Sequence, residues 1–428
     1  MDESEDIRLW GFRQLQRDIR GSRGYLVVGI DVAKERHHAF FGTVTGKTLL
    51  RRLVFDNSRE GFEKLVLHTE AIKVQHSLSQ VVFGLEPTAN YHKPLGEYLI
   101  TGGHHVVLVS GTAVKRNREL LDSRWDKHDT KDAANVADLV SQGKCLFYEY
   151  PSVALRDLRS LLSLKRRLKR LEHGYRVRIR NHLLAQYFPE LDGYYGQSLS
   201  EGLAIVRWCL APAVITGLGF EEFVRLVTAR QGGIRQQRRL RMIWERAAGS
   251  IGCEGGAMVG FEARLMVEGL CQLREAIRAT EEKIEGICTQ FPEYQYLLTI
   301  PGFGPAVSAT VLGALGNPFR FERAAQVIKM AGFDLGADRS GKGSDTAVPV
   351  ISKKGKADLR YALYQVALIA SVKNRTFIVY YTNKLRNRQG ERGIKTKMRV
   401  KVAAKLLVIA WTLMKKKEVF NPAYLNIA

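Results

Sequence analysis

Four carboxylate side chains stand at positions where they could share one metal-dependent reaction. Asp31 ends the apolar segment YLVVGID, and Glu86 ends a second apolar segment, VVFGLE. Asp129 and Asp132 are three residues apart in HDTKD and share one face if a helix begins there. Four carboxylates gather only around a compensating cation, so the set predicts a hard metal ion such as Mg²⁺. Such ions polarise a phosphodiester and activate an oxygen nucleophile.

Residues 25–149 must position these carboxylates, and their pattern is that of alternating strands and helices. Three strands come first and suit an antiparallel meander, whereas the later crossovers through helices suit parallel strands. Strand ends and a helix start can converge in such a fold, which favours a metal site over scattered structural acids. Residues 1–24 are expected to form an extension. The expected strands are 25–31, 38–44, 49–56, 81–86 and 105–110, and the expected helices are 60–73, 93–100 and 132–142.

Residues 150–290 are predicted to be helical, with a coiled-coil pattern. Apolar residues recur with alternating steps of four and three over three heptads, which is typical of a coiled-coil seam. A hairpin within the chain and an association between subunits explain this pattern equally well, and 193–260 carries no interpretable motif. The seam is Met266, Leu270, Leu273, Ile277, Thr280, Ile284 and Ile287, preceded by Leu161, Leu164, Leu168, Leu171 and Tyr175.

Residues 291–428 begin with a helix, a Pro-Gly-x-Gly-Pro turn and a second helix. Gly302 and Gly304 let the backbone approach a DNA phosphate, as in a helix-hairpin-helix, although an ordinary helical turn remains the alternative. The segment 353–417 contains 18 Lys and Arg but two acidic residues, and four tyrosines lie among them. This composition is typical of a surface that binds DNA or RNA.

The overall composition agrees with a nucleic-acid partner. The 428 residues carry 66 Lys and Arg against 43 Asp and Glu, a net charge of +23, and 45% are hydrophobic, which excludes wholesale disorder. The five cysteines form no C-x-x-C pair, so a zinc finger or disulfide scaffold is not expected. The apolar run 406–414 is too short to span a bilayer, so we expect a cytoplasmic, nucleoid-associated protein without a membrane partner.

Two sets of motifs resemble one known family. GIDVAK, GLEPTANYH and KHDTKDAANVADL look like the DEDD motif of RuvC/RNase H-like domains in insertion-sequence transposases of the IS110 family, which includes Piv-type DNA invertases. IPGFGP, FERAAQVIKMAGF, RSGKG and VISKKGKADLRYAL are similar to the second domain of that family. The resemblance implies an α/β RuvC/RNase H-like domain, a helical coiled-coil middle, and a mainly α-helical C-terminal transposase domain.

The resemblance also implies an activity. Members cut and rejoin DNA through a covalent serine linkage, guided by a bridge RNA that pairs with donor and target DNA. They act as tetramers built from dimers, in which two subunits complete each active site. Carried over residue by residue, the nucleophile is Ser340, and Asp31, Glu86, Asp129 and Asp132 are catalytic and hold the metal.

Without the resemblance, the residues leave several candidate nucleophiles open. A serine beside a glycine is usually a turn residue, and Ser344 lies close to Ser340. Tyr380 and Tyr381 could serve a tyrosine-type recombinase, but their apolar context, FIVYY, favours a place in the core. A RuvC-type nuclease or junction resolvase that uses water, and a non-catalytic nucleic-acid-binding protein, remain alternatives to the serine recombinase.

Further positions match the family pattern and are expected to contact nucleic acid. Two departures affect the loops near the carboxylates: Ala89 stands where the family often has Gly, and His128 stands where Thr is common. Neither departure removes an expected metal ligand. The expected contacts are Lys34, Tyr91, Lys127, Gly302, Gly304, Lys342, Lys354 and Arg360.

Overall fold

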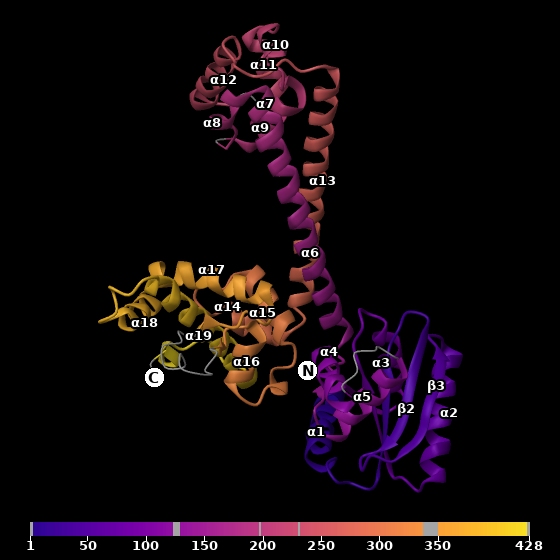
Figure 1. Cartoon of the computed structure of the whole chain (residues 1–428). Coiled ribbons are helices and arrows are strands. Elements are labelled where there is room, and N and C mark those ends of the chain that lie inside the picture. Colours follow the sequence, from indigo (N-terminus) through magenta and orange to yellow (C-terminus); the bar gives the residue numbers. More distant parts are fainter. Residues whose placement is uncertain (1–2, 123–128, 197, 230–231, 337–349, 426–428) are drawn as a thin grey trace. The chain divides into compact units, whose positions relative to one another are not determined.

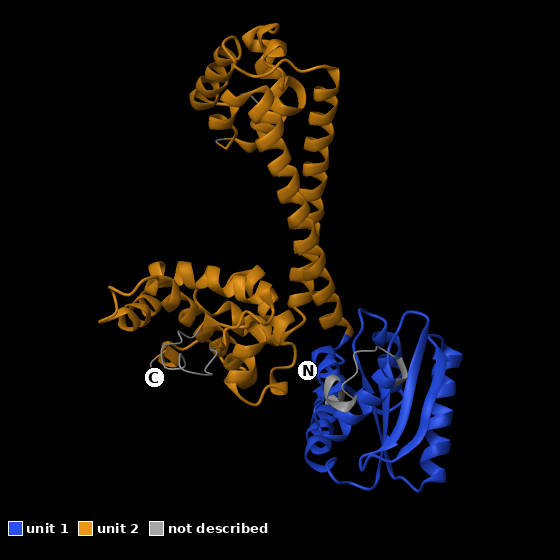
Figure 2. Cartoon of the chain, in the orientation of Figure 1, with its two compact units in different colours: residues 1–152 blue, residues 153–428 orange. Residues whose placement is uncertain are grey.

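The computed structural model describes residues 3–122, 129–196, 198–229, 232–336 and 350–425. The chain forms two compact units, residues 1–152 and 153–428, which are shown in different colours in Figure 2. Each unit has a hydrophobic interior of its own. No helix in the described part of the chain is both long and apolar enough to cross a membrane.

The first unit contains a mixed sheet with the strand order β3-β2-β1-β4-β5-β6. The first three strands form an antiparallel meander, and β4 and β5 add in parallel, as the sequence predicts. A short sixth strand, which the sequence did not reveal, pairs antiparallel with β5. The strands are β1 (Tyr25–Asp31), β2 (Arg36–Thr43), β3 (Thr48–Asp56), β4 (Gln80–Leu85), β5 (His105–Leu108) and β6 (Leu146–Phe147).

Helices cover both faces of this sheet (Figure 1). Because successive side chains of a strand point to opposite faces, Val28 packs in one core layer and Val27 in the other. The first 24 residues, expected as an extension, contain a helix. Its Leu15 and the residue that follows the helix, Ile19, are buried in the same layer as Val27. The helices of the unit are α1 (Glu3–Asp18), α2 (Arg59–Gln75), α3 (His92–Thr101), α4 (Gly111–Asp122) and α5 (Asp129–Ser141).

The second unit begins with a helical hairpin made of α6 (Val153–Arg178) and α13 (Ala257–Cys288). The helices run antiparallel, since Lys165 pairs with Glu281 at 2.8 Å and Arg178 pairs with Glu262 at 2.5 Å. Of the two interpretations of the heptad pattern, the structure therefore shows the hairpin within the chain. Four seam residues of α13 are buried, Leu270, Ile277, Thr280 and Ile284.

The chain between the two hairpin helices folds into a helical tip with its own core. This tip accounts for most of the region 193–260, for which the sequence offered no interpretation. Its elements are the π-helical turn η1 (Ile179–Leu184), α7 (Ala185–Tyr187), η2 (Pro189–Leu191), α8 (Asp192–Tyr195), α9 (Leu199–Cys209), α10 (Pro212–Thr216), α11 (Phe220–Val227) and α12 (Ile234–Ala247).

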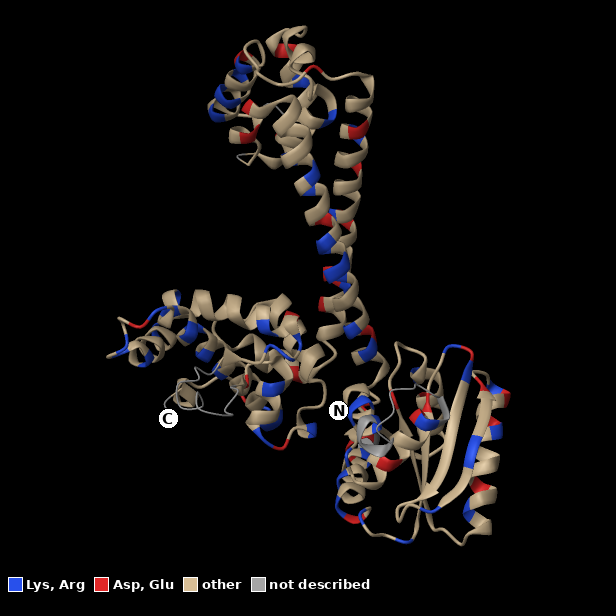
Figure 3. Ribbon diagram, viewed as in Figure 1, with Lys and Arg blue, Asp and Glu red and all other residues tan. Residues whose placement is uncertain are grey.

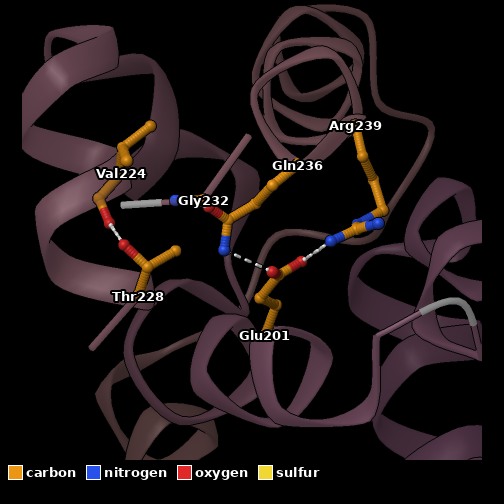
Figure 4. Close-up of polar contacts among 6 residues, drawn as sticks. All are labelled: Glu201, Val224, Thr228, Gly232, Gln236 and Arg239. Carbon is orange, nitrogen blue, oxygen red and sulfur yellow. Dashed lines mark hydrogen bonds and ion pairs between the residues drawn. The ribbon is translucent and has the colours of Figure 1, made fainter. Parts of the chain in front are cut away.

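One buried carboxylate ties α9 to α12 inside the tip (Figure 4). Glu201 is 8% exposed and accepts hydrogen bonds from Gln236 Nε2 at 2.7 Å and from Arg239 Nε at 2.9 Å. The amide oxygen of Gln236, Oε1, accepts a hydrogen bond from the N–H of Gly232. This contact fixes the segment that leads into α12. A buried charge needs a partner and hydrogen bonds of this kind, so these contacts fix how the two helices pack.

The rest of the second unit is a helical domain built around α19. The apolar run 406–414 lies within α19 and is buried against the neighbouring helices, which explains its hydrophobicity without a membrane. Its elements are α14 (Pro292–Leu298), α15 (Pro305–Leu315), η3 (Pro318–Arg320), α16 (Ala324–Ala331), β7 (Leu335–Gly336), β8 (Val350–Ile351), α17 (Ala357–Lys373), α18 (Arg375–Leu385), α19 (Ile394–Lys416) and η4 (Pro422–Leu425).

We expect Glu201→Gln to destabilise the tip by about 3 kcal/mol, because the Arg239 side chain, only 19% exposed, would lose its counter-charge. Urea unfolding combined with limited proteolysis of residues 179–256 measures the loss. Glu282→Gln is the matched control, because Glu282 and Arg278 lie 3.9 Å apart with side chains 71% and 78% exposed. The exposed pair should contribute between 0 and about 1 kcal/mol, and equal losses in the two variants would contradict the prediction.

We also expect the first unit to lose stability as the pH falls below 6.5. Burial lowers the pKa of His37, His92, His104 and His105 below the ordinary value of 6.5. The unfolded chain therefore binds protons first, and the free energy of unfolding decreases from pH 6.5 down to the folded-state pKa values. At about pH 7.5 and above these residues are almost entirely neutral in both states and add little pH dependence. Hydrogen exchange of the sheet amides measures the effect, and equal protection at about pH 7.5 and about pH 5.5 would refute it.

Candidate active site

Two of the four expected carboxylates lie at the ends of adjacent parallel strands. Asp31 is the last residue of β1 and Glu86 directly follows β4. The two strands pair with Ile30 opposite Leu85, and the N–H of Glu86 donates to Ile30 O at 3.3 Å. The sheet register thus makes Asp31 and Glu86 neighbours at one edge, as the sequence predicts.

A close contact between α5 and the sheet brings the third described carboxylate to the same region. A Cβ atom on Gly29 would lie 2.2 Å from Ala133 O, and one on Gly84 would lie 2.6 Å from a methyl of Val140. The two glycines are opposite each other in the β1–β4 pair, so together they let α5 rest on the strands. Side chains two residues apart share a face of the sheet. Asp31 and Glu86 therefore follow the glycines on the face that α5 covers.

Asp132 is held within a polar contact between α4 and α5. Its side chain is 3% exposed and forms an ion pair with Arg118. Beside it, Asn117 Nδ2 donates to Asn135 Oδ1 at 3.2 Å and to Asp138 Oδ2 at 2.9 Å. These partners were missed in the sequence. Their one signal is the spacing of Asp132, Asn135 and Asp138, polar residues three apart among the Ala, Val and Leu residues of 133–140.

Glu86 lies against the beginning of α4. A Cβ atom on Gly111, the first residue of that helix, would be 2.7 Å from Glu86 Oε1. The free N–H groups and partial positive charge at a helix N-terminus favour a carboxylate there. Glycine at this position therefore makes room for the carboxylate, and α4 contributes both to the Glu86 environment and to the Asp132 ion pair.

The carboxylates suit a hard cation, although the described side chains alone do not form a metal cluster. No group of three acidic, histidine or cysteine side chains close enough to hold a metal occurs among the residues searched in the described part of the chain. Asp129 begins α5, but its side chain lies outside the described part. The buried Oδ1 of Asp132 is the atom that pairs with Arg118, so a metal ion held by this oxygen would replace or share that guanidinium contact.

Two of the three remaining residues of the first unit that we expect to contact nucleic acid lie in the described part of the chain. Lys34 is exposed in the loop after β1, where its carbonyl accepts a hydrogen bond from Asn57 Nδ2 at 3.1 Å. Tyr91 is 37% exposed and directly precedes α3. Lys127 lies outside the described residues. Nucleic-acid contact by Lys34 and Tyr91 stays a prediction.

The Pro-Gly-x-Gly-Pro segment forms a tight turn between α14 and α15. Gly302 has a φ of +89°, and a Cβ atom there would lie 3.0 Å from Val366 Cγ1 of α17. Glycine is therefore required by both backbone conformation and space. Gly304 caps α15 and has open space around its missing side chain. The helix–turn–helix geometry matches the expectation, and phosphate contact at this turn stays a prediction.

Ser340 and Lys342 lie outside the described residues, as does Ser344. The chain on either side is fixed, because β7 and β8 pair with Leu335 opposite Ile351. A Cβ atom on Gly355 would lie 2.4 Å from Met330 O, so this glycine lets the chain after β8 pack on the end of α16.

Of the two basic residues expected near this segment, one has a visible structural role. Arg360 Nη1 donates to Ala331 O at 2.8 Å and thereby satisfies a carbonyl at the end of α16. The same nitrogen also donates to Lys353 O at 3.4 Å, so phosphate contact by the remaining guanidinium N–H groups stays a prediction. Lys354 is exposed.

The tyrosines of α18 are packed in the domain core. Tyr381 is 9% exposed, and its hydroxyl donates to Lys395 O at 3.4 Å. Burial raises the pKa of Tyr380, which makes its phenolate harder to form. These observations favour the core interpretation over a tyrosine nucleophile.

Figure 3 shows Lys and Arg along the hairpin, in the tip and on the C-terminal helices of the second unit.

Gly29→Ala should displace α5 and destabilise the first unit by about 1–3 kcal/mol, because the new methyl group would meet backbone atoms of α5. Faster hydrogen exchange of the α5 amides would report the change. Gly174→Ala is the control, since a Cβ atom on this helical glycine meets nothing within 4 Å. It should stabilise α6 by up to about 1 kcal/mol. Unchanged α5 protection in Gly29→Ala would contradict the assigned contact.

Known proteins match both parts of the chain. The DEDD transposase model of IS110 matches residues 28–189, and the model of the transposase IS116/IS110/IS902 family matches residues 294–382. An uncharacterized 43.6 kDa protein of insertion element IS110 from Streptomyces coelicolor is 24% identical over 86% of this chain and 88% of its own length. An uncharacterized 44.8 kDa protein of insertion element IS116 from Streptomyces clavuligerus is 23% identical over 92% of this chain and 96% of its own length. The chain belongs to the IS110 family of transposases.

Proposed function

We propose that this transposase is an RNA-guided DNA recombinase with a RuvC-like first domain and a serine nucleophile in its C-terminal domain. The observation that carries the proposal is the meeting of Asp31 and Glu86 on paired strand ends beneath the helix that holds Asp132. Membership in a transposase family implies DNA as the substrate. An acidic site on a DNA-binding protein repels phosphate unless a cation intervenes, which favours a metal-dependent role for these carboxylates.

In this proposal Asp31, Glu86, Asp129 and Asp132 would hold Mg²⁺. The ion, when bound, supplies a Lewis acid that stabilises charge on the scissile phosphate. Within the chain, Arg118 neutralises Asp132, and the start of α4 stabilises Glu86. These contacts let the acidic groups stay close together before a cation binds.

Ser340 would supply the attacking oxygen. Its Oγ forms a bond to phosphorus, the bond from phosphorus to the departing sugar oxygen breaks, and that oxygen takes up a proton as a free DNA end. The serine proton passes to solvent, so the step is balanced. Because one phosphodiester replaces another, attack by a new DNA end can reverse the step without an energy cofactor.

The proposed partners are donor DNA, target DNA and a guide RNA, with assembly as dimers and tetramers. The basic residues of α17–α19 and the turn before α15 would contact phosphates, and pairing with RNA would select the sequence. The RuvC-type nuclease or resolvase remains the alternative. It uses the same carboxylates with water and leaves no protein–DNA bond.

A trapping experiment separates these functions. Purified protein is incubated with Mg²⁺, candidate guide RNA and cognate DNA, then denatured, and the DNA covalently attached to protein is measured. Wild type should give an adduct, and Ser340→Ala and Asp129→Ala should each reduce it by at least about a hundredfold, as for other essential catalytic groups.

Ser344→Ala is the matched control, because it removes the same hydroxyl four residues from Ser340 in the same segment. It should keep the adduct, and mapping should place DNA on Ser340. Cleavage that survives Ser340→Ala without an adduct would instead establish the nuclease. An adduct that survives Ser340→Ala but disappears in Ser344→Ala would move the nucleophile.

A further inference from the structure

A cavity of about 670 Å³ lies where α6 passes through η1 into the helical tip. Its walls come from the last turns of α6, from η1, and from α8 and α9. A π-helical turn such as η1 is uncommon and is often found at functional sites. The charged and polar side chains that line the cavity are His173, Arg176, Arg180, Asn181, Asp192 and Tyr195.

Of the two arginines described in the cavity wall, the fold uses Arg180 and leaves Arg176 without a hydrogen bond or ion pair to a described residue. Arg180 is paired with Asp192 through two contacts of 2.6 and 3.0 Å. Arg176 lies one turn earlier, is exposed, and makes no hydrogen bond or ion pair with any residue in the described ranges. Its guanidinium is therefore available to an anionic group, for which its planar set of donors is well suited.

The cavity wall also includes a tyrosine whose hydroxyl receives no hydrogen bond from the described residues. Tyr195 is 8% exposed, and its buried hydroxyl makes no hydrogen bond within the described part of the chain. A buried hydroxyl without a partner costs free energy, so folding alone does not account for it. The neighbouring Gly193 and Gly196 leave the wall open, because a Cβ atom on either would meet nothing within 4 Å.

We propose that this cavity binds one unstacked nucleotide of a single-stranded nucleic acid. Arg176 would contact the phosphate, Val177 and Leu199 would pack against the base, and Asn181 and Tyr195 would hydrogen-bond its polar edge. A hollow of this size with apolar and polar walls can hold a single base that is no longer stacked on its neighbours. A duplex would present its phosphates to the protein, because its bases are stacked inside. The site is separate from the carboxylates and is not needed for the proposed chemistry.

Photochemical crosslinking tests the site directly. The full chain is irradiated with single strands of about ten nucleotides that contain 5-iodouracil, as DNA in one arm and as RNA in the other. Mg²⁺ is omitted, so strand cleavage does not affect the result. Mass spectrometry should map crosslinks to Tyr195 or His173, and a matching duplex should give few. If crosslinks avoid residues 173–199 in both arms, the proposal fails.

Arg176→Ala should reduce this crosslink about fivefold to tenfold, because it removes the proposed phosphate contact. Arg170→Ala is the matched control, since Arg170 is equally basic, exposed on the same helix and outside the cavity. Equal reductions would show general attraction of a polyanion and overturn the proposal.

Tyr195→Phe separates a ligand-binding role from a structural one. It should weaken the crosslink at His173 without lowering the melting temperature, because the hydroxyl makes no hydrogen bond within the described part of the chain. A lower melting temperature with an unchanged crosslink would mean that the hydroxyl is structural and would contradict the proposal. Competition gives a second check. If inorganic phosphate abolishes the crosslink at the same concentration as uridine monophosphate does, the cavity is a simple anion site and the proposal is overturned.

Discussion

The contact of α5 with β1 and β4 is the constraint on which the candidate active site depends. It requires glycine at two positions that face each other across the strand pair, Gly29 and Gly84. Any larger residue would push the helix off the sheet and move Asp132 away from the strand ends that carry Asp31 and Glu86. The glycines therefore carry no chemistry themselves, yet they set the spacing of the groups that do.

Electrostatics imposes the second requirement on this region. Carboxylates that lie close together repel one another. Arg118 on α4 compensates the charge of Asp132, and the N-terminus of the same helix stabilises Glu86. Helix α4 thus compensates two different carboxylates through one element. A cation arriving at Asp132 would take over the role of Arg118, so the protein without a metal and the protein with a metal can both be stable.

The second unit buries its apolar surface in three places. The hairpin helices bury their seam against each other, the tip has a separate core closed by Glu201, and the C-terminal helices surround α19. The cavity proposed to bind a nucleotide lies where the first two of these meet. This division explains why 193–260 carries no family motif in the sequence and yet folds, since packing within the tip requires helical amphipathicity and no particular signature.

The sequence by itself determined the strand order of the meander, the parallel addition of β4 and β5, the helical middle, and the placement of Asp31 and Glu86 at strand ends. These follow from local hydrophobic periodicity and turn residues, which act over short stretches of chain. The motifs also determined the family. The sequence did not determine whether the heptad seam closes within the chain, that residues 3–18 belong to the first core, or that Arg118 pairs with Asp132. Only the tertiary structure decided these, because each depends on which distant surface a segment meets, and a pattern of residue types does not name its partner.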